Sequence, residues 1–216
     1  MRNLFFILIA GAGAWQWSQG GFSFSSSVSA FDESGNPVVK VLTVDDCGKP
    51  CQMAISELKR RRVDFEEIQI DPHQGTGDAV DLWKAEGQGG FPLIVSGEEK
   101  INGSGTPAQV ATLLGLNFND KYFSSAEKRY YKKHFYEGGS PRVVMYGADW
   151  CPYTKKLREE LQANNIDFVE IDVDKSGQKE KISRTMGISG YPTTWVGYTR
   201  VNGSSLKDVD KVLKNY

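Results

Sequence analysis

The amino-acid sequence contains two copies of one pattern, and this repeat limits the fold more than any other feature. The tripeptide Asn-Gly-Ser occurs at 102–104 and again at 202–204. Upstream, Val-Asp-Phe at 63–65 is matched by Ile-Asp-Phe at 166–168. We therefore expect two related domains that follow each other in the chain.

Each copy predicts the element order β–α–β–α–β–β–α. In the first copy a β-branched run at 38–44 predicts a buried strand, and the alternation at 63–70 predicts the next one. A capping signal at Thr106 with Gln109 starts the last helix of that copy, and Gly115 is expected to end it. Right-handed crossovers would build a mixed sheet from these elements, so the fold class is α/β.

The same signals predict the domain boundaries. The expected segments are a signal peptide or short membrane anchor at 1–14, a flexible linker at 15–37, a first domain at 38–116, a connector at 117–140 and a second domain at 141–216.

The first 14 residues have a positive start, a short apolar run and then small residues. This is the composition of a secretory signal, with a cleavage site at 12–14. The run is shorter than the roughly 20 residues that a membrane span needs. The alternatives are an uncleaved anchor, with Trp15 and Trp17 at the membrane interface, and a buried helix. We expect a bacterial protein that is periplasmic or secreted, with membrane contact only through this segment.

The composition argues against two kinds of ligand. The chain of 216 residues is 25% charged and has a net charge of -1, which gives no electrostatic basis for binding nucleic acid. The histidines His73 and His134 have no second ligand near them in the sequence. No nucleic acid and no metal are therefore expected.

Cys151 stands at the start of a predicted helix. Pro152 follows it at the first helical position, where the missing N–H costs nothing. The unpaired N–H groups and the positive end of the helix dipole stabilise an anion there, so the thiol should lose its proton more easily. A lone cysteine is otherwise most often a small buried apolar residue. The Trp, Tyr, Thr and Lys neighbours favour a reactive thiol.

The run Trp-Cys-Pro-Tyr-Thr at 150–154 resembles the active-site turn of glutaredoxins and, more broadly, of the thioredoxin superfamily. A second match is Gly-Tyr-Pro-Thr at 190–193, which resembles the loop whose cis-proline faces the active cysteine in that superfamily. Gly-Phe-Pro at 90–92 is its counterpart in the first copy. The resemblance implies two tandem thioredoxin-like, or glutaredoxin-like, domains, each a mixed sheet flanked by helices.

The resemblance also implies roles for individual residues. Cys151 is the nucleophile, and Thr154 stands where a two-cysteine motif has its resolving thiol. This pattern is that of a monothiol glutaredoxin, whose thiol exchanges with mixed disulfides. The implied co-substrate is glutathione, and the implied partners are thiol or disulfide proteins. The expected substrate-binding residues are Pro152, Tyr153, Thr154, Tyr191 and Pro192, with Phe91 and Pro92 in the first copy.

The first copy has two cysteines in its turn. Cys47 and Cys51 are separated by three residues, against two in the usual redox motif, which indicates one inserted residue and places Cys51 where Thr154 falls. The pair is either a second redox centre or a structural disulfide. A further hypothesis is a relay in which Cys151 exchanges with this pair across a cleft between the domains.

The sequence departs from the glutaredoxin pattern at the glutathione site. The family usually has a lysine shortly before the cysteine, and this chain has Ala148, with Lys155 or Arg158 as candidate substitutes. The leading hypothesis is a thiol–disulfide oxidoreductase. The alternatives are a redox-inactive binding module with the same fold and, third, an iron–sulfur carrier.

Overall fold

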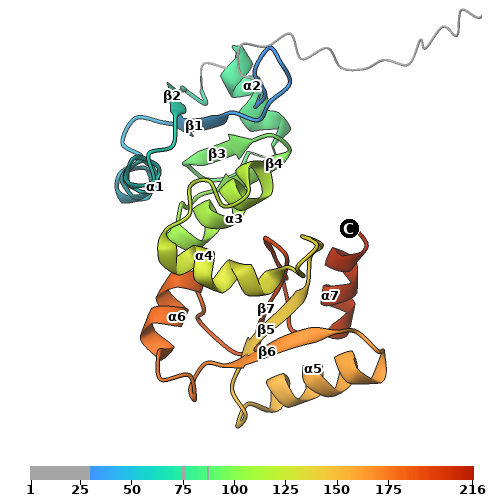
Figure 1. The fold of residues 1–216 in the computed structure, drawn as a ribbon. Helices are drawn as coiled ribbons and strands as arrows, with labels where there is room; N and C mark the ends of the chain where they lie inside the picture. The colour runs from blue at the N-terminus through green and yellow to red at the C-terminus, as the bar shows by residue number, and fades with distance from the viewer. Residues whose placement is uncertain (1–29, 74–75, 87) are drawn as a thin grey trace, which may run out of the picture.

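The computed structural model describes residues 30–73, 76–86 and 88–216, and in these residues it has two four-stranded sheets (Figure 1). The expected signal or anchor segment, 1–14, and most of the expected linker lie outside the described residues. No helix in the described part of the chain is both long and apolar enough to span a bilayer.

The elements follow the predicted order. The first domain contains β1 (Val39–Thr43), α1 (Lys49–Arg60), β2 (Phe65–Gln69), α2 (Asp78–Ala85), β3 (Leu93–Ser96), β4 (Glu99–Asn102) and α3 (Pro107–Phe118). The connector contains α4 (Ser125–Tyr131) and a 3-10 turn, η1 (Lys132–His134). The second domain contains β5 (Val143–Gly147), α5 (Pro152–Ala163), β6 (Phe168–Asp172), α6 (Lys179–Met186), β7 (Thr193–Val196), β8 (Thr199–Arg200) and α7 (Leu206–Leu213).

The two sheets have the same topology. Their strand orders are β2-β1-β3-β4 and β6-β5-β7-β8. In each sheet the first two strands in sequence pair in parallel, and the other pairs are antiparallel. This arrangement confirms the α/β class and the tandem mixed sheets.

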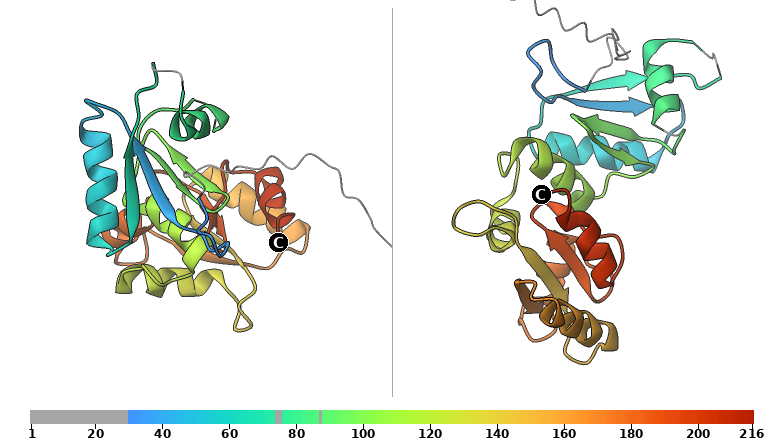
Figure 2. Two further views of the ribbon diagram at one scale, coloured as in Figure 1. Left: turned by 90° about the horizontal axis from the view of Figure 1, so that it is seen from above. Right: turned by 90° about the vertical axis from the view of Figure 1, so that its right-hand side faces the viewer.

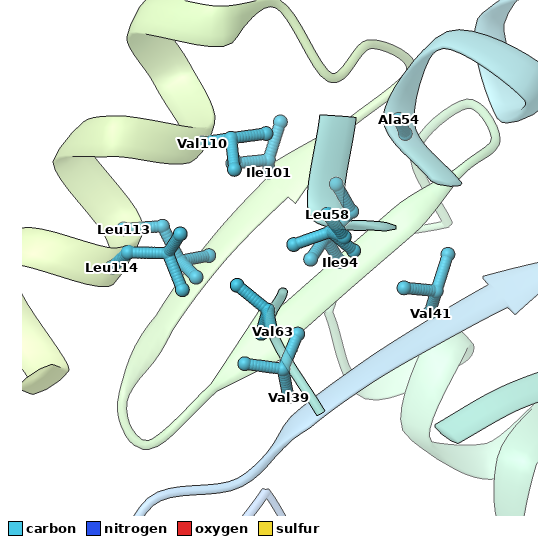
Figure 3. Close-up of a cluster of buried hydrophobic side chains, with 10 residues drawn as sticks. All are labelled: Val39, Val41, Ala54, Leu58, Val63, Ile94, Ile101, Val110, Leu113 and Leu114. Carbon is cyan, nitrogen blue, oxygen red and sulfur yellow. The ribbon is translucent and has the colours of Figure 1, made fainter. Parts of the chain in front are cut away.

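The core of the first domain lies on both faces of its sheet. Helices α1 and α3 cover one face, and α2 covers the other (Figure 2). Burial of these apolar side chains is the main force that holds the layers together. Figure 3 shows the cluster under α1 and α3, which consists of Val39, Val41, Ala54, Leu58, Val63, Ile94, Ile101, Val110, Leu113 and Leu114.

The second domain does not cover its sheet alone. Helices α5 and α7 pack on one face, and α6 packs on the other. The second face also receives Ala111 of α3 and the connector residues Phe123, Tyr130 and Tyr131. Figure 1 accordingly shows α3 and α4 between the two sheets. Part of the first domain and the connector therefore complete the core of the second domain.

Helix α3 continues past Gly115, where the sequence predicted its end. A Cβ at Gly115 would lie 2.6 Å from the ring of Tyr198, in the second domain. The glycine therefore serves a close approach between the domains and does not terminate the helix, despite a cost of about 1 kcal/mol relative to alanine. The Thr106–Gln109 capping box, in contrast, starts α3 as predicted.

A buried arginine joins the first domain to the connector. Arg61 donates through Nε to Glu57 and through both terminal nitrogens to Glu127. The same terminal nitrogens also donate to the carbonyl oxygens of Tyr122 and Pro107. All five guanidinium N–H groups thus have acceptors, which is what a buried charge requires.

The segment 30–37 is ordered against the first sheet. Phe31 and Pro37 form an isolated bridge, and the carbonyl of Ala30 accepts from the N–H groups of Val38 and Gly97. We expected a flexible linker to run as far as residue 37. These hydrogen bonds instead tie its last eight residues to β1 and to the β3–β4 turn.

Candidate active site

The structure places Cys151 at the N-cap of α5, between β5 and the helix. Pro152 is the first residue of that helix, as predicted. The Cys151 thiol donates to the carbonyl oxygen of Tyr191 at 3.5 Å, so the turn and the Tyr191–Pro192 loop meet at the sulfur. The peptide bonds that precede Pro92 and Pro192 are both cis, as the resemblance implied. Cys151 is 5% exposed.

Hydrogen bonds at the helix start lower the pKa of Cys151. Burial raises this pKa, but the N–H and hydroxyl of Thr154 and the N–H of Tyr153 stabilise the thiolate and outweigh burial. The sulfur is therefore easier to deprotonate than a free thiol, which makes it a better nucleophile near neutral pH. Thr154, in the third position of the helix, supplies two of the three stabilising contacts.

The geometry of the turn depends on Gly147, the last residue of β5. A Cβ there would lie 2.4 Å from Cγ2 of Thr154. Only glycine allows the strand end and the helix start to approach this closely. The side chains on the other side of the thiol are open to solvent, since Trp150 is 67% exposed and Tyr153 is 63% exposed.

Asp174, which the sequence analysis missed, connects the two segments around the thiol. Its carboxylate accepts from the indole N–H of Trp150 at 2.7 Å and from the hydroxyl of Tyr191 at 2.9 Å. It also pairs with Lys179 at 2.8 Å. Hydrogen bonds from Lys179, Trp150 and Tyr191 lower the pKa of Asp174 to about 2. The carboxylate is therefore charged at neutral pH and can accept these hydrogen bonds.

Arg158 is not available as the substitute for the missing lysine. Its guanidinium pairs with Glu170 through two bonds of 2.6 Å and with Asp149 at 3.3 Å. A bidentate pair of this kind fixes the planar group in place. Of the two candidate substitutes, this leaves Lys155.

The first domain has a disulfide in the corresponding turn. Cys47 and Cys51 are bonded, with their Cα atoms 5.8 Å apart. Cys51 is the third residue of α1, and Thr154 is the third residue of α5, so the two align as the spacing predicted. Cys51 is buried and Cys47 is partly exposed. Gly48 occupies the N-cap with a φ of 68°, a conformation that glycine adopts without strain.

The other candidate residues of the first domain belong to its core. Phe91 stacks on Trp83, with ring centroids 5.5 Å apart, under α2. Pro92 is buried immediately before β3. The structure therefore brings the second-domain candidates together around Cys151 and keeps the first-domain candidates separate from them.

A cleft of about 790 Å³ lies between the domains; Tyr191, which contacts the thiol, lines it, but Cys151 does not. We call it the interdomain cleft. The first domain lines it with β4 and with α3, and the second lines it with the loop 189–193 and with 199–204. Cys47 and Cys51 are not among its lining residues. Helices α1 and α5 also lie far apart in Figure 1. The hypothesis of a relay across this cleft therefore finds no support.

Within the part of the chain that the structure describes, no cluster of three or more His, Cys, Asp or Glu residues could hold a metal ion. His134 is buried instead as a structural group. One ring nitrogen bonds the carbonyl of Gly197 at 2.9 Å and the other bonds the hydroxyl of Tyr146 at 3.0 Å. Burial lowers its pKa to about 4, against a weaker opposing effect of the Gly197 bond, so the ring is neutral.

The second domain is similar in sequence to known proteins. The family model described as Glutaredoxin matches residues 143–201. A glutaredoxin of Pseudomonas aeruginosa is 38% identical over 64 residues, which is 29% of this chain and 76% of that protein. The chain belongs to the glutaredoxin family. An uncharacterised glutaredoxin-like protein of Clostridium pasteurianum is 29% identical over 73 residues, which covers 33% of this chain and 97% of that protein. Among solved structures, a glutaredoxin of Archaeoglobus fulgidus is 25% identical, with a TM-score of 0.31, and covers 39% of this chain and 92% of that one.

Proposed function

We propose that this glutaredoxin-family protein is a monothiol thiol–disulfide oxidoreductase that reduces mixed disulfides at Cys151. The observation that carries the proposal is the position of this sulfur. It sits at a helix N-cap, faces three hydrogen-bond donors that lower its pKa, and contacts the Tyr191–Pro192 loop. A thiolate held in this way attacks disulfides.

The proposed reaction has two exchange steps. In the first, the Cys151 thiolate attacks the glutathione sulfur of a mixed disulfide and forms a new S–S bond. The other sulfur leaves as a thiolate and takes a proton from water. In the second, a glutathione thiolate attacks the glutathione sulfur of this intermediate. Cys151 leaves as a thiolate, and glutathione disulfide is released.

The cysteine count favours an external resolving thiol. The chain has three cysteines, and two of them, Cys47 and Cys51, are bonded to each other. Thr154 occupies the position from which a second thiol would otherwise resolve the intermediate. Glutathione fits the resolving role because glutaredoxins use it as co-substrate.

The Cys47–Cys51 pair is part of the same proposal, as a second redox centre. It lies at the repeat's equivalent of the Cys151 turn, and Cys47 is partly exposed. Two electrons from an external thiol pair would open it to two thiols. Equilibration in glutathione buffers, followed by alkylation and mass spectrometry, measures its reduction potential. A pair that stays oxidised below about -300 mV would be structural.

We also propose that the folded part works outside the cytoplasm, in the periplasm or after secretion. The N-terminal composition and the presence of a disulfide support this address. Cell fractionation with an antibody to the chain tests it, because recovery in the cytoplasmic fraction alone would contradict it.

The activity is tested with a glutathionylated peptide and reduced glutathione, with glutathione disulfide as the product measured. The Cys151→Ser variant should fall to the uncatalysed rate, because serine supplies no thiolate. The control is the double variant Cys47→Ser/Cys51→Ser, which should retain turnover. If the Cys151→Ser variant kept its rate, or the wild type had none, a redox-inactive binding module would be the better description.

A further inference from the structure

The open edges of both sheets line the interdomain cleft. Among the described strands, β4 pairs only with β3 and β8 pairs only with β7, so each has an unpaired side. All of β4 and all of β8 belong to the cleft lining. An unpaired strand edge offers a row of N–H and C=O groups to another chain.

The hairpin register shows which backbone groups face the cleft. The β3–β4 loop has two residues, and Ser96 pairs with Glu99 next to it. Pairs in an antiparallel ladder alternate between hydrogen-bonded and non-hydrogen-bonded, and the pair that closes a two-residue loop is bonded. Lys100, opposite Val95, is therefore in a non-bonded pair, and its N–H and C=O point away from β3.

The second domain repeats this arrangement. The N–H of Val201 donates to the carbonyl of Thr194 at 2.9 Å, so that pair is a bonded one. Arg200, one residue earlier and opposite Trp195, is then in a non-bonded pair. Its N–H and C=O point away from β7, as those of Lys100 point away from β3.

The cleft lining also includes one side of α3 and the loop whose Tyr191 contacts the thiol. Ala108, Thr112 and Leu116 recur at a spacing of four, so they form one side of α3, and all three line the cleft. The loop with Tyr191 and Pro192 also lines it. The Tyr191 carbonyl lies 3.5 Å from the Cys151 sulfur, so Tyr191 links the cleft lining to the reactive group, although Cys151 itself does not line the cleft.

We propose that the interdomain cleft binds an extended polypeptide segment of the substrate, next to the disulfide that Cys151 attacks, and that β4 of the first domain pairs with this segment through the backbone of Lys100. This inference deepens the proposed function and rests on it: the preferred substrate is a protein or peptide mixed disulfide, and the first domain contributes to its recognition. Strand addition of this kind takes its affinity from main-chain hydrogen bonds.

The dimensions of the cleft fit this substrate class. Four residues of β4 at about 3.3 Å each give an open edge of about 13 Å, enough for a strand of about four residues. The volume of about 790 Å³ is near the upper part of the roughly 300–1,000 Å³ range of ordinary ligand sites.

The test removes one outward N–H without touching the catalytic residues. Lys100→Pro deletes the N–H that faces the cleft and leaves the bonded pairs of β4 in place, since proline is tolerated on edge strands. The matched control is Lys100→Ala, which keeps the N–H and removes the side chain together with its ion pair to Glu86. Thermal unfolding monitored by circular dichroism checks that both variants fold.

Both variants are assayed on a glutathionylated decapeptide and on the mixed disulfide of glutathione with 2-mercaptoethanol. Lys100→Pro should raise KM for the peptide about 3- to 10-fold, which is the equivalent of one lost hydrogen bond. Its kinetics with the small disulfide should match the wild type. Lys100→Ala should match the wild type with both substrates. Equal behaviour of Lys100→Pro and Lys100→Ala on the peptide would overturn the inference.

A binding measurement separates this inference from the proposed activity. Calorimetric titration of the decapeptide is made with the Cys151→Ser protein, with and without Lys100→Pro. Weaker binding in the Lys100→Pro protein supports the cleft as a peptide site even if the wild type has no reductase activity. Unchanged or absent binding refutes it, even if the reductase activity is present.

Discussion

Replacing Arg61 with methionine should destabilise the protein far more than replacing its neighbour Arg60. Both arginines bond Glu57, but Arg61 is buried and its five donors are all satisfied, whereas the Arg60 side chain is 56% exposed. Methionine fills much of the Arg61 volume and supplies no charge. The carboxylate of Glu127, with a side chain that is 4% exposed, then loses its cationic partner.

The size of the stability loss depends on which hydrogen bonds and ion pairs Glu57 and Glu127 keep when Arg61 is replaced. Breaking a buried ion pair from one side costs about 3–5 kcal/mol, because it leaves an uncompensated charge. Glu127 keeps two bonds of 2.7 Å from the N–H and hydroxyl of Ser124, and Glu57 keeps Arg60. We therefore expect the lower part of that range for Arg61→Met, about 3 kcal/mol. Arg60→Met should cost less than about 1 kcal/mol, as exposed pairs do.

Urea unfolding at pH 7, followed by circular dichroism, measures both losses. In thermal unfolding, the same loss of about 3 kcal/mol would lower Tm by about 6–12 °C for a chain of this length. The double variant Arg61→Met/Glu127→Gln should be more stable than Arg61→Met alone, because a glutamine at position 127 leaves no unpaired buried charge. If Arg61→Met cost no more than Arg60→Met, the buried network would not hold the connector against the first domain, and the reasoning would fail.

Two further predictions concern groups with shifted pKa values. Thr154→Val removes a hydroxyl that stabilises the thiolate, so the pKa of Cys151 should rise and the pH profile of alkylation should move to higher pH, whereas Thr154→Ser should keep the wild-type profile. His134 has a folded-state pKa of about 4, below its ordinary 6.5, so the unfolded chain binds the proton first and stability falls as the pH drops through this window. The free energy of unfolding should fall by about 2 kcal/mol between pH 7 and pH 4.5 because of this group. Urea unfolding at the two pH values measures this fall, and a His134→Gln variant should lack the part that His134 contributes.

The sequence was sufficient for those parts of the structure that depend on local patterns. The repeat predicted two sheets of the same topology, and the Thr106–Gln109 signal predicted the start of α3. The placement of Cys151 before a helix followed from its proline neighbour. Each of these depends on residues a few positions apart, where propensity and capping chemistry decide the outcome.

The parts that were missed depend on contacts between distant segments. From the sequence alone, Gly115 predicts the end of a helix, because its close contact with Tyr198 of the second domain is visible only in the structure. Arg61 lies at the C-terminal end of α1 and its partner Glu127 is 66 residues away, so no local pattern indicates the pair. Asp174 lies two residues after the end of β6, at the carboxyl edge of the strands where the active turn also lies, and this was the signal that could have identified it. Its link to Trp150 and Tyr191 is visible only in three dimensions.

Aromatic residues of the connector pack on the second sheet, and this contact limits where the chain can be cut into separately folding fragments. Tandem modules are commonly recombined or expressed as separate pieces. A fragment beginning at residue 141 would keep the thiol and the whole family signature. It would lack Phe123 and Tyr131, however, and the apolar surface around Trp195 and Val144 would then face water. In this chain the unit for expression and engineering is therefore the whole pair of domains, although the proposed chemistry belongs to one of them.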